Sequence, residues 1–432
     1  MSGAASILVR ARTEGDLTAP LFGFPQPPAS AGVPPIEGDL AATIGASAAE
    51  PKGLAEVQVD LAKQPPRNVA FLHVQSHALD DDRWAFSLLG MSSVKNLPPT
   101  KARARPRLVL ADLAQSVIPE KSRQPSQILA VMREFSKDNR EVPLWVNELR
   151  AAVDDDLHLV IIDHSGFEIP WELLTLPISH SGTETYLGAA VSTSRWQDIR
   201  DDRTFGDRLL RVEYQEHIGR IAAFVDVQAL KNGGQESGIL AEMHAAVENG
   251  LKPLEDRLTR PEEGFGLVYL ACHGHWVPSL LGFALGSDVE TGDQLVLGLL
   301  QAKQLRLFEH SSAVVFINAC HSGRMFKEEE YLDTARLRGF PELFIGKGAA
   351  GVIGTTGFVN DAFAAKMANW LLRTLQTTEE PVSKLLQMWR ASVVEDLPAA
   401  PSEHDNVALL NAFMYVYYGN PLSRLRIVWG PP

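Results

Sequence analysis

The chain has 432 residues, 45% of them hydrophobic and 22% charged, and this composition excludes a wholly disordered protein. The length exceeds the usual size of one hydrophobic core, so we expect two or three domains or subdomains. The formal net charge is −13, which disfavours nucleic acid or an anionic membrane surface as the main partner.

The first hundred residues contain no motif that indicates a function. Residues 18–37 are rich in proline, alanine and glycine and indicate an extended arm or linker. Strand-like alternation follows at residues 57–61, 69–74 and 83–89. This favours a small β-containing domain, and the basic run at 101–107 after it is typical of a solvated linker. We therefore expect residues 1–104 to form a separate N-terminal region.

The rest of the chain alternates between strand-like and helix-like segments. Helical spacing of apolar residues occurs at 126–135 and 144–153, before a buried strand at 157–163. Beyond these, we predict strands at 220–227, at the residues leading to His273, at those leading to Cys320 and at 349–355, and helices at 238–248, 295–308, 341–347 and 362–375. Asn360 or Asp361 is a suitable N-cap for the last helix. The alternation predicts an α/β fold with a doubly wound, mostly parallel central sheet flanked by helices.

Two of these strands end abruptly at reactive side chains that are followed by glycine. The first ends in Ala271-Cys272-His273-Gly274, and the second in Asn318-Ala319-Cys320-His321-Ser322-Gly323. The carboxyl ends of neighbouring parallel strands form the ligand crevice of such a sheet, so we expect an imidazole and a thiol to meet there. His273 and Cys320 are 47 residues apart, which leaves room for a crossover connection.

A cysteine and a histidine at one crevice favour nucleophilic catalysis. We expect Cys320 to be the nucleophile, and His273 to be the base and later the acid that protonates the leaving amine. Gly274 and the Cys320 amide would form the oxyanion hole. His275 competes with His273 because residues two apart in a strand share a face, but the glycine that directly follows His273 favours the earlier residue.

Other interpretations of these residues stay open. A cysteine at a strand end is often a small buried hydrophobe, which is the interpretation we favour for Cys272. His321 either lowers the pKa of the neighbouring thiol or is merely exposed. A zinc site is disfavoured because the Cys and His residues lack the usual paired spacing, and we expect no metal and no cofactor. Residues 163–166, Asp-His-Ser-Gly, look like a triad fragment but are more typical of a turn.

Together these segments resemble the CHAT peptidases, bacterial relatives of caspases, metacaspases and separase. Besides the two strand ends, the likeness is carried by Leu159-Val160-Ile161-Ile162-Asp163, Ile169-Pro170-Trp171-Glu172-Leu173-Leu174, Gly346-Lys347-Gly348-Ala349-Ala350-Gly351, Val359-Asn360-Asp361 and Tyr417-Tyr418-Gly419-Asn420-Pro421. It implies a caspase-like fold, with a front subdomain at 105–205 and a catalytic core at 206–432. Cys320 and His273 stand where caspase-like families carry the catalytic pair, and their separation is close to the roughly 50 residues of caspases.

The resemblance also implies residues for the S1 pocket. Asp226 ends the first strand of the catalytic core, and Asn318 lies two residues before Cys320; in related families both places can line S1. An acid at Asp226 would favour Arg or Lys at P1 of the substrate. Asn318 departs from the metacaspase pattern, which has an acid there.

Two functions from different classes follow. The first is a cysteine endopeptidase that cleaves a protein substrate in bacterial antiphage defence or programmed death, and that stays inactive until a sensor or partner protein engages it. The charged segment 324–338 is then the expected activation loop, as in caspase-like enzymes. The second is a catalytically silent CHAT-like module that binds a peptide or partner protein without cutting it.

The expected compartment is the cytoplasm. Residues 1–15 are charged and lack the apolar core of a secretory signal, and no run approaches the roughly 18 apolar residues of a membrane span. Only two cysteines are present, which favours a reducing environment. A disulfide between Cys272 and Cys320 would silence the proposed nucleophile. We expect neither nucleic acid nor a membrane as a direct partner.

Overall fold

The computed structural model describes residues 65–80, 83–104, 124–163, 165, 168–177, 185–197, 199–201, 206–208, 210–277, 281–286, 293–327 and 337–428. The predicted arm at 18–37 and the predicted strand at 57–61 lie outside these ranges.

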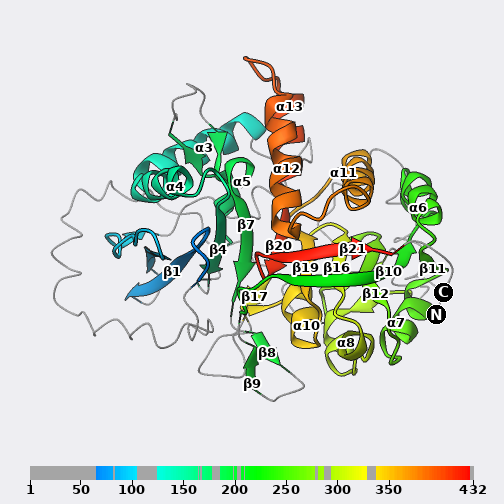
Figure 1. Ribbon diagram of the computed structural model, residues 1–432. Coiled ribbons are helices and arrows are strands. Elements are labelled where there is room, and N and C mark those ends of the chain that lie inside the picture. The colour runs from blue at the N-terminus through cyan, green and yellow to red at the C-terminus, as the bar shows by residue number, and fades with distance from the viewer. Residues whose placement is uncertain are drawn as a thin grey trace, which may run out of the picture. The chain divides into compact units, whose positions relative to one another are not determined.

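A twelve-stranded sheet forms the centre of the fold (Figure 1). Its strand order is β11 (Ala246–Glu248), β10 (Gln215–Val225), β12 (Phe265–Ala271), β16 (Val314–Asn318), β19 (Gly351–Thr355), β20 (Tyr415–Gly419), β7 (Ser192–Trp196), β4 (His158–Asp163), β1 (Val69–Asp80), β2 (Arg83–Ser92) and β3 (Arg103–Ala104), and β21 (Ser423–Ile427) pairs with β10. Only the β19–β20, β1–β2 and β2–β3 pairs among these described strands are antiparallel. The predicted α/β class with a mostly parallel sheet is therefore confirmed.

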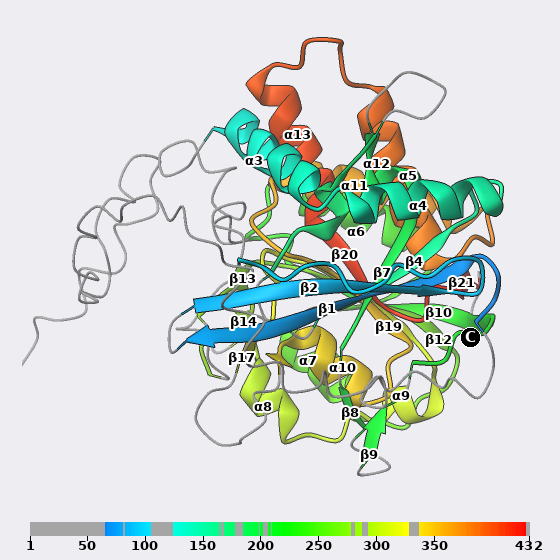
Figure 2. The same ribbon diagram turned by 90° about the vertical axis from the view of Figure 1, so that its left-hand side faces the viewer.

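Helices cover both faces of this sheet (Figures 1 and 2). One face carries α3 (Pro125–Asp138), α4 (Glu141–Ala152), α5 (Leu187–Ala190), α6 (Gly233–Glu242), α11 (Asp361–Thr374), α12 (Val382–Glu395) and α13 (Glu403–Met414), and the other carries α7 (Leu251–Leu258), α8 (Leu297–Gln301), α9 (Leu307–His310) and α10 (Phe340–Gly346). Each face of the sheet packs its own hydrophobic core. In β4, Leu159 and Ile161 belong to the first core, on the face that α12 covers, and Val160 and Ile162 belong to the second core, on the face that α10 covers. Burial on both faces explains why this strand is a continuous apolar run.

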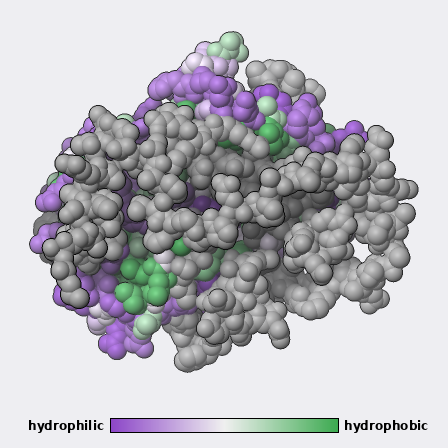
Figure 3. Space-filling model, turned by 180° about the vertical axis from the view of Figure 1, so that it is seen from behind, coloured by the Kyte–Doolittle hydropathy of each residue, from purple (hydrophilic) through white to green (hydrophobic). Residues whose placement is uncertain are grey.

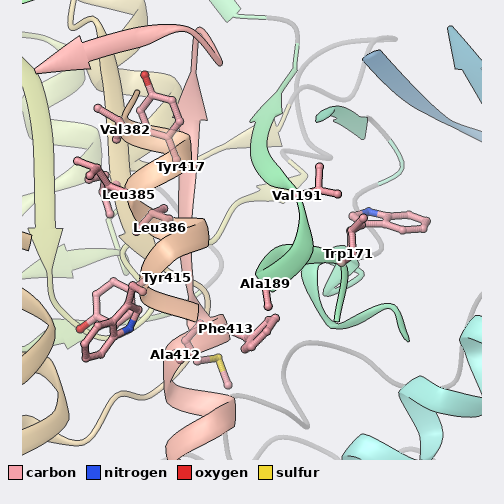
Figure 4. Close-up of a cluster of buried hydrophobic side chains, with 14 of the residues drawn as sticks. Trp171, Ala189, Val191, Val382, Leu385, Leu386, Ala412, Phe413, Tyr415 and Tyr417 are labelled. Carbon is pink, nitrogen blue, oxygen red and sulfur yellow. The ribbon is translucent and has the colours of Figure 1, made fainter. Parts of the chain in front are cut away.

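The first core is built around α12. Figure 4 shows part of it, with Val382, Leu385 and Leu386 of α12, Phe413 of α13, Tyr415 and Tyr417 of β20, and Trp171 of the short turn η2 (Trp171–Leu173). α12 packs against α5 and β7, which precede Cys320 in the chain, and against β20, which follows it. It therefore holds these two parts of the chain together.

Four small antiparallel sheets complete the described structure. They are β13 (Gly274–His275) with β14 (Ala284–Leu285) and β15 (Leu295–Val296), β17 (Phe326–Lys327) with β18 (Leu337–Arg338), β5 (Thr175–Leu176) with β6 (Thr185–Tyr186), and β8 (Ile199–Asp201) with β9 (Gly206–Arg208).

Two predicted helices differ from those in the structure. The segment 295–308 begins as strand β15, because Leu295 pairs with Leu285, and is helical only in α8 and α9. The segment 238–248 is helical only to Glu242, and its last three residues form β11 against β10. In both places strand pairing overrides the local helical pattern. The N-cap at Asn360 is confirmed, since its side chain accepts bonds from the amides of Ala362 and Phe363 at 3.0 and 3.3 Å.

The strands that precede residue 104 belong to the central sheet. β1 pairs with β2 and, in parallel, with β4, so the strands predicted at 69–74 and 83–89 are strands of the central sheet. The domain boundaries at 104 and 205 stay predictions.

Large apolar side chains on the described surface are scattered. They include Leu144, Tyr214, Leu281 and Leu299, and Figure 3 shows mostly hydrophilic groups among the coloured residues of one face. Within the described ranges, no helix is long and apolar enough to cross a membrane.

A buried ion pair in the first core gives a test of stability. Arg195 Nε donates to Glu172 Oε1 at 3.0 Å, and the Glu172 side chain is almost fully buried. Burial opposes ionisation of Glu172, but Arg195 and Arg390 hold the pKa of its carboxyl below the usual range. We expect Arg195→Met to lower the free energy of unfolding by about 3 kcal/mol, because it leaves a buried carboxylate without its closest partner. Urea unfolding measures this. A second change, Glu172→Met, should restore part of the loss, and a loss from the first change of under about 1 kcal/mol would contradict the argument.

Candidate active site

The two predicted catalytic side chains lie at the ends of neighbouring strands. β12 and β16 are adjacent and parallel, and Ala271 pairs with Asn318. His273 and Cys320 each follow that pair by two residues, so both leave the sheet at the same level. They line one cavity of about 60 Å³, with Leu230, Glu236, Cys272, Asn318, Ala319, Val359, Asp361 and Ala364. A water molecule needs roughly 10–15 Å³ by the same measure, so the cavity admits a side chain.

The two free cysteines occupy different environments. Cys272 is 2% exposed and belongs to the second core, where burial raises the pKa of its thiol well above the usual range. Cys320 is partly exposed, and its Sγ lies 3.9 Å from the Val359 carbonyl oxygen, to which it donates a weak hydrogen bond. Burial also raises the pKa of the Cys320 thiol. In this conformation Cys320 is therefore a protonated thiol at neutral pH.

His273 and His275 differ in their hydrogen bonds. The Nε2 atom of His275 lies 2.8 Å from the Gly286 carbonyl oxygen and donates to it. The ring of His273 lines the cavity and, among the described residues, has no hydrogen-bond partner. Its ring is therefore available to exchange a proton with a group in the cavity, which favours His273 over His275 as the base.

Gly274 packs against the backbone of the candidate nucleophile. A Cβ atom at this position would lie 2.9 Å from the carbonyl carbon and 3.1 Å from the amide nitrogen of Cys320, and would overlap the Cys320 carbonyl oxygen. Glycine is therefore required here by close approach. The two proposed oxyanion-hole residues lie side by side.

The turn that carries Cys320 is bonded to the ends of β19 and β20. Ser322 Oγ donates to the Ile317 carbonyl oxygen at 2.9 Å and accepts from the Thr355 amide at 3.0 Å. The Gly323 amide donates to the Thr355 carbonyl at 2.8 Å, and the Tyr418 hydroxyl donates to the Gly323 carbonyl at 3.0 Å. The Ser-Gly part of the motif therefore fixes the backbone of the nucleophile.

His321 is neither exposed nor a source of positive charge. Its backbone has φ of +61°, and its buried ring stacks edge-on against Phe358 with the ring centres 4.4 Å apart. Burial, with a further contribution from Arg324, lowers its pKa to about 3, so the ring is neutral at physiological pH. Both interpretations from the sequence were wrong. Left-handed residues other than glycine are uncommon, and this one fits a constrained functional turn.

The two predicted S1 residues lie in different places. Asn318 lines the cavity, but its side chain is bonded inside the protein: Oδ1 accepts from the Tyr415 hydroxyl at 2.7 Å, and Nδ2 donates to the Ala364 carbonyl at 3.2 Å. Asp226 is not among the described residues that line the cavity. Its Oδ1 accepts from the Ala229 amide at 3.0 Å and so holds the turn after β10.

Two acids that the sequence analysis did not assign to the site line the cavity. Asp361 was considered only as a helix cap, and Glu236 was not considered. Glu236 stands on the buried face of α6 with Ile239 and Leu240, three and four residues later. Glu236 lies two residues before the helix predicted at 238–248, so that prediction gave no signal for its place on an apolar helix face.

Alternative sites receive no support within the described ranges. No group of three or more Cys, His, Asp or Glu side chains is arranged to hold a metal ion in that part of the chain. Asp163 Oδ1 accepts from the Ser165 amide at 2.9 Å, which is the bond of a local turn; His164 and Gly166 lie outside the description.

Comparisons with known proteins identify a family and several solved structures with limited similarity. The family model described as the CHAT domain matches residues 159–406. No curated protein matches the sequence. A crystal structure of the Saccharomyces cerevisiae separase–securin complex is similar with a TM-score of 0.37 and 14% identity, over 63% of this chain and 16% of that one. The Arg-specific cysteine proteinase gingipain R gives a TM-score of 0.41 and 12% identity, over 65% of this chain and 67% of that one. The chain thus spans less than a fifth of the separase chain in the first of these structures.

The two thiols should react differently with an alkylating agent. We expect iodoacetamide to modify Cys320 and spare Cys272 in the folded protein, because Cys320 is partly exposed whereas Cys272 is only 2% exposed. Since burial raises the pKa of Cys320, its rate should increase with pH and not level off below pH 9.0. Mass spectrometry of timed samples measures both. A fast reaction with a plateau near neutral pH would contradict the protonated resting thiol.

Gly274 should tolerate no side chain. Gly274→Ala is expected to lower the thermal stability and the reactivity of Cys320 together, because a Cβ atom would displace the Cys320 backbone. The matched control is Gly238→Ala in α6, where a Cβ atom meets nothing within 4 Å and alanine should stabilise the helix by roughly 0.5–1 kcal/mol. Equal melting temperatures and alkylation rates for the two variants would refute the close approach.

Proposed function

Because the chain belongs to the CHAT domain family, we propose that it is a caspase-like cysteine endopeptidase with Cys320 and His273 as its catalytic dyad. The observation that carries this proposal is the shared cavity: thiol and imidazole, from adjacent strand ends, line the same space. The partly exposed Cys320 and the unbonded ring of His273 support these roles.

The proposed reaction uses groups that lie around the cavity. His273 takes the thiol proton, and the Cys320 thiolate attacks the carbonyl carbon of the scissile bond. The backbone amides of Gly274 and Cys320 stabilise the oxyanion that forms. His273 then protonates the leaving amine, and water, activated by the same ring, hydrolyses the thioester.

The resting geometry supports a latent enzyme. The thiol donates to Val359 rather than to the His273 ring, and its raised pKa opposes thiolate formation. An activating or sensor protein would shift the site to a state in which thiol and imidazole pair, by binding that state better. The proposed activation loop is 324–338, of which residues 328–336 lie outside the description.

Arg324, at the start of that loop, contacts the segment that follows His273. The guanidinium of Arg324 donates to both carboxylate oxygens of Glu168, at 2.8 and 2.7 Å, and lies 4.3 Å from the ring centre of Trp276, three residues after His273. A change in the conformation of this loop would therefore act, through Arg324 and Trp276, on the segment that carries His273.

A role in bacterial antiphage defence or programmed death, in the cytoplasm and with a protein substrate, is part of the proposal. The alternative is a catalytically silent CHAT module that binds a peptide or partner protein without cleaving it. The raised pKa of the Cys320 thiol is the observation that favours this alternative.

Substitution of the dyad separates the two functions. We expect Cys320→Ala to abolish proteolysis with an unchanged fold, because only a sulfur atom at a strand end is removed. His273→Ala should lose comparable activity, since nucleophile and base act as one unit. His275→Ala is the matched control, because that ring is bonded to Gly286.

The measurement is cleavage of proteins in a cell lysate, which also supplies activators, with circular dichroism as the check on folding. Parent-like cleavage by the Cys320→Ala protein would rule out the thiol as nucleophile. A dead His275→Ala protein beside an active His273→Ala protein would move the base by two residues.

A further inference from the structure

The cavity beside Cys320 has apolar walls and carboxyl groups at two depths. Leu230, Val359 and Ala364 supply the apolar lining. Glu236 is the deep acid, because its side chain is only 1% exposed, whereas Asp361 is partly exposed. An aliphatic stem with a polar end is the shape and chemistry that such a lining accommodates.

Glu236 is a buried acid without a basic partner. Its carboxyl accepts from the Tyr269 hydroxyl and lies 3.4 Å from Asn318 Nδ2. Among the described residues, no Lys, Arg or His forms an ion pair with it. A carboxylate in such surroundings is costly unless a cation compensates it, and the open side of Glu236 is the cavity.

Asp361 has a free oxygen near the cavity entrance. Its Oδ2 atom accepts from the Asn232 amide at 2.9 Å and from Asn232 Nδ2 at 2.6 Å, so the carboxylate is held in place. Within the described ranges, its Oδ1 atom has no hydrogen-bond partner. A cationic group that enters the cavity would meet this oxygen before it reached Glu236.

We infer that this cavity is the S1 pocket for an arginine or lysine side chain, with Glu236 as the specificity-determining acid at its floor. This rests on the proposed peptidase function, because S1 is defined by the nucleophile beside it. Apolar walls hold the aliphatic stem, Asp361 meets the charged group on entry, and Glu236 pairs with it at the end. The basic P1 preference is retained from the sequence analysis, but the acid that provides it changes from Asp226 to Glu236.

Binding of a cation here is coupled to release of a proton. Burial raises the pKa of Glu236 to about 7, against the bonds from Tyr269 and Asn318. The other titratable groups that face it are Asp361 of α11, Tyr415 of β20, and Cys272 after β12, with His273 and Cys320 across the cavity. A bound cation favours the carboxylate, so the Glu236 proton passes to solvent. Affinity for a basic side chain should therefore rise as the pH increases through about 7.

The test uses the full chain with Cys320→Ala, so that binding is measured without cleavage. The probes are acetyl-arginine amide and acetyl-citrulline amide, which differ in a guanidinium and a neutral urea of nearly the same shape. Isothermal titration calorimetry should show binding of the arginine probe at least roughly ten-fold tighter, with the advantage larger at pH 8 than at pH 6. Titrations in phosphate and in Tris at the same pH should differ in heat, because a proton is released.

Two matched variants assign the acid. Glu236→Gln retains the size of the side chain and its hydrogen-bonding capacity toward Tyr269 and Asn318, and is expected to remove the arginine advantage, its pH dependence and the buffer effect together. Asp226→Asn should leave all three unchanged. Each variant is first compared with the parent by thermal unfolding, so that a folding defect is recognised.

The outcomes separate this inference from the peptidase proposal. Equal affinity for the two probes, or binding of neither, overturns the inference, as does an arginine advantage that survives Glu236→Gln or is lost in Asp226→Asn. If the arginine probe binds as expected but the parent cleaves nothing in lysate, the peptidase proposal fails and the basic pocket belongs to a silent peptide-binding module.

Discussion

Five consecutive residue pairs join β12 to β16 in parallel, from Leu267 with Val314 to Ala271 with Asn318. This register brings His273 and Cys320 to the same level at one edge of the sheet. Because side chains alternate between the two faces of a strand, a slip of one residue would exchange the faces of every side chain on β12 and separate the two groups. The packing of both cores, which requires each strand residue on its own side, therefore also fixes the relative positions of His273 and Cys320.

Below this edge of the sheet lies a network of buried polar side chains, whose burial costs free energy unless each is hydrogen-bonded. Tyr269 of β12 and Asn318 at the end of β16 contact Glu236, and Tyr415 completes the chain of hydrogen bonds through Asn318. A buried network of this kind stabilises one arrangement when all its members are satisfied and weakens the core when one is not. The strands that form the hydrophobic cores thus also carry the polar floor of the cavity.

The sequence was most informative where local pattern and function coincide. Apolar runs ending in Cys-His-Gly and Cys-His-Ser-Gly predicted two neighbouring strand ends, and the alternation of segments predicted the sheet. The N-cap at Asn360 followed from local hydrogen-bonding capacity alone. These features depend on residues close together in the chain, so a single sequence contains them.

Other features depended on tertiary pairing and were not predictable in the same way. β15 and β11 were predicted as helix because their local apolar spacing is helical, and pairing with β14 and β10 makes them strands instead. Glu236 enters the site from α6, which precedes β12 by more than twenty residues, and no local signal connected it with Cys320. The state of His321 required knowledge that Phe358 covers its ring.

The turn that carries Cys320 depends on hydrogen bonds to residues that are synthesised much later. Gly323 is held by Thr355 and by Tyr418, and a ribosome adds Tyr418 almost a hundred residues after Cys320. In the sheet, β20 lies between β19 and β7. The two halves of the sheet therefore cannot join before β20 has been made. A nascent chain that has already exposed its cysteine and histidine therefore lacks the support that gives them a fixed geometry. During translation, the geometry around Cys320 and His273 is therefore completed only after β20 has been made.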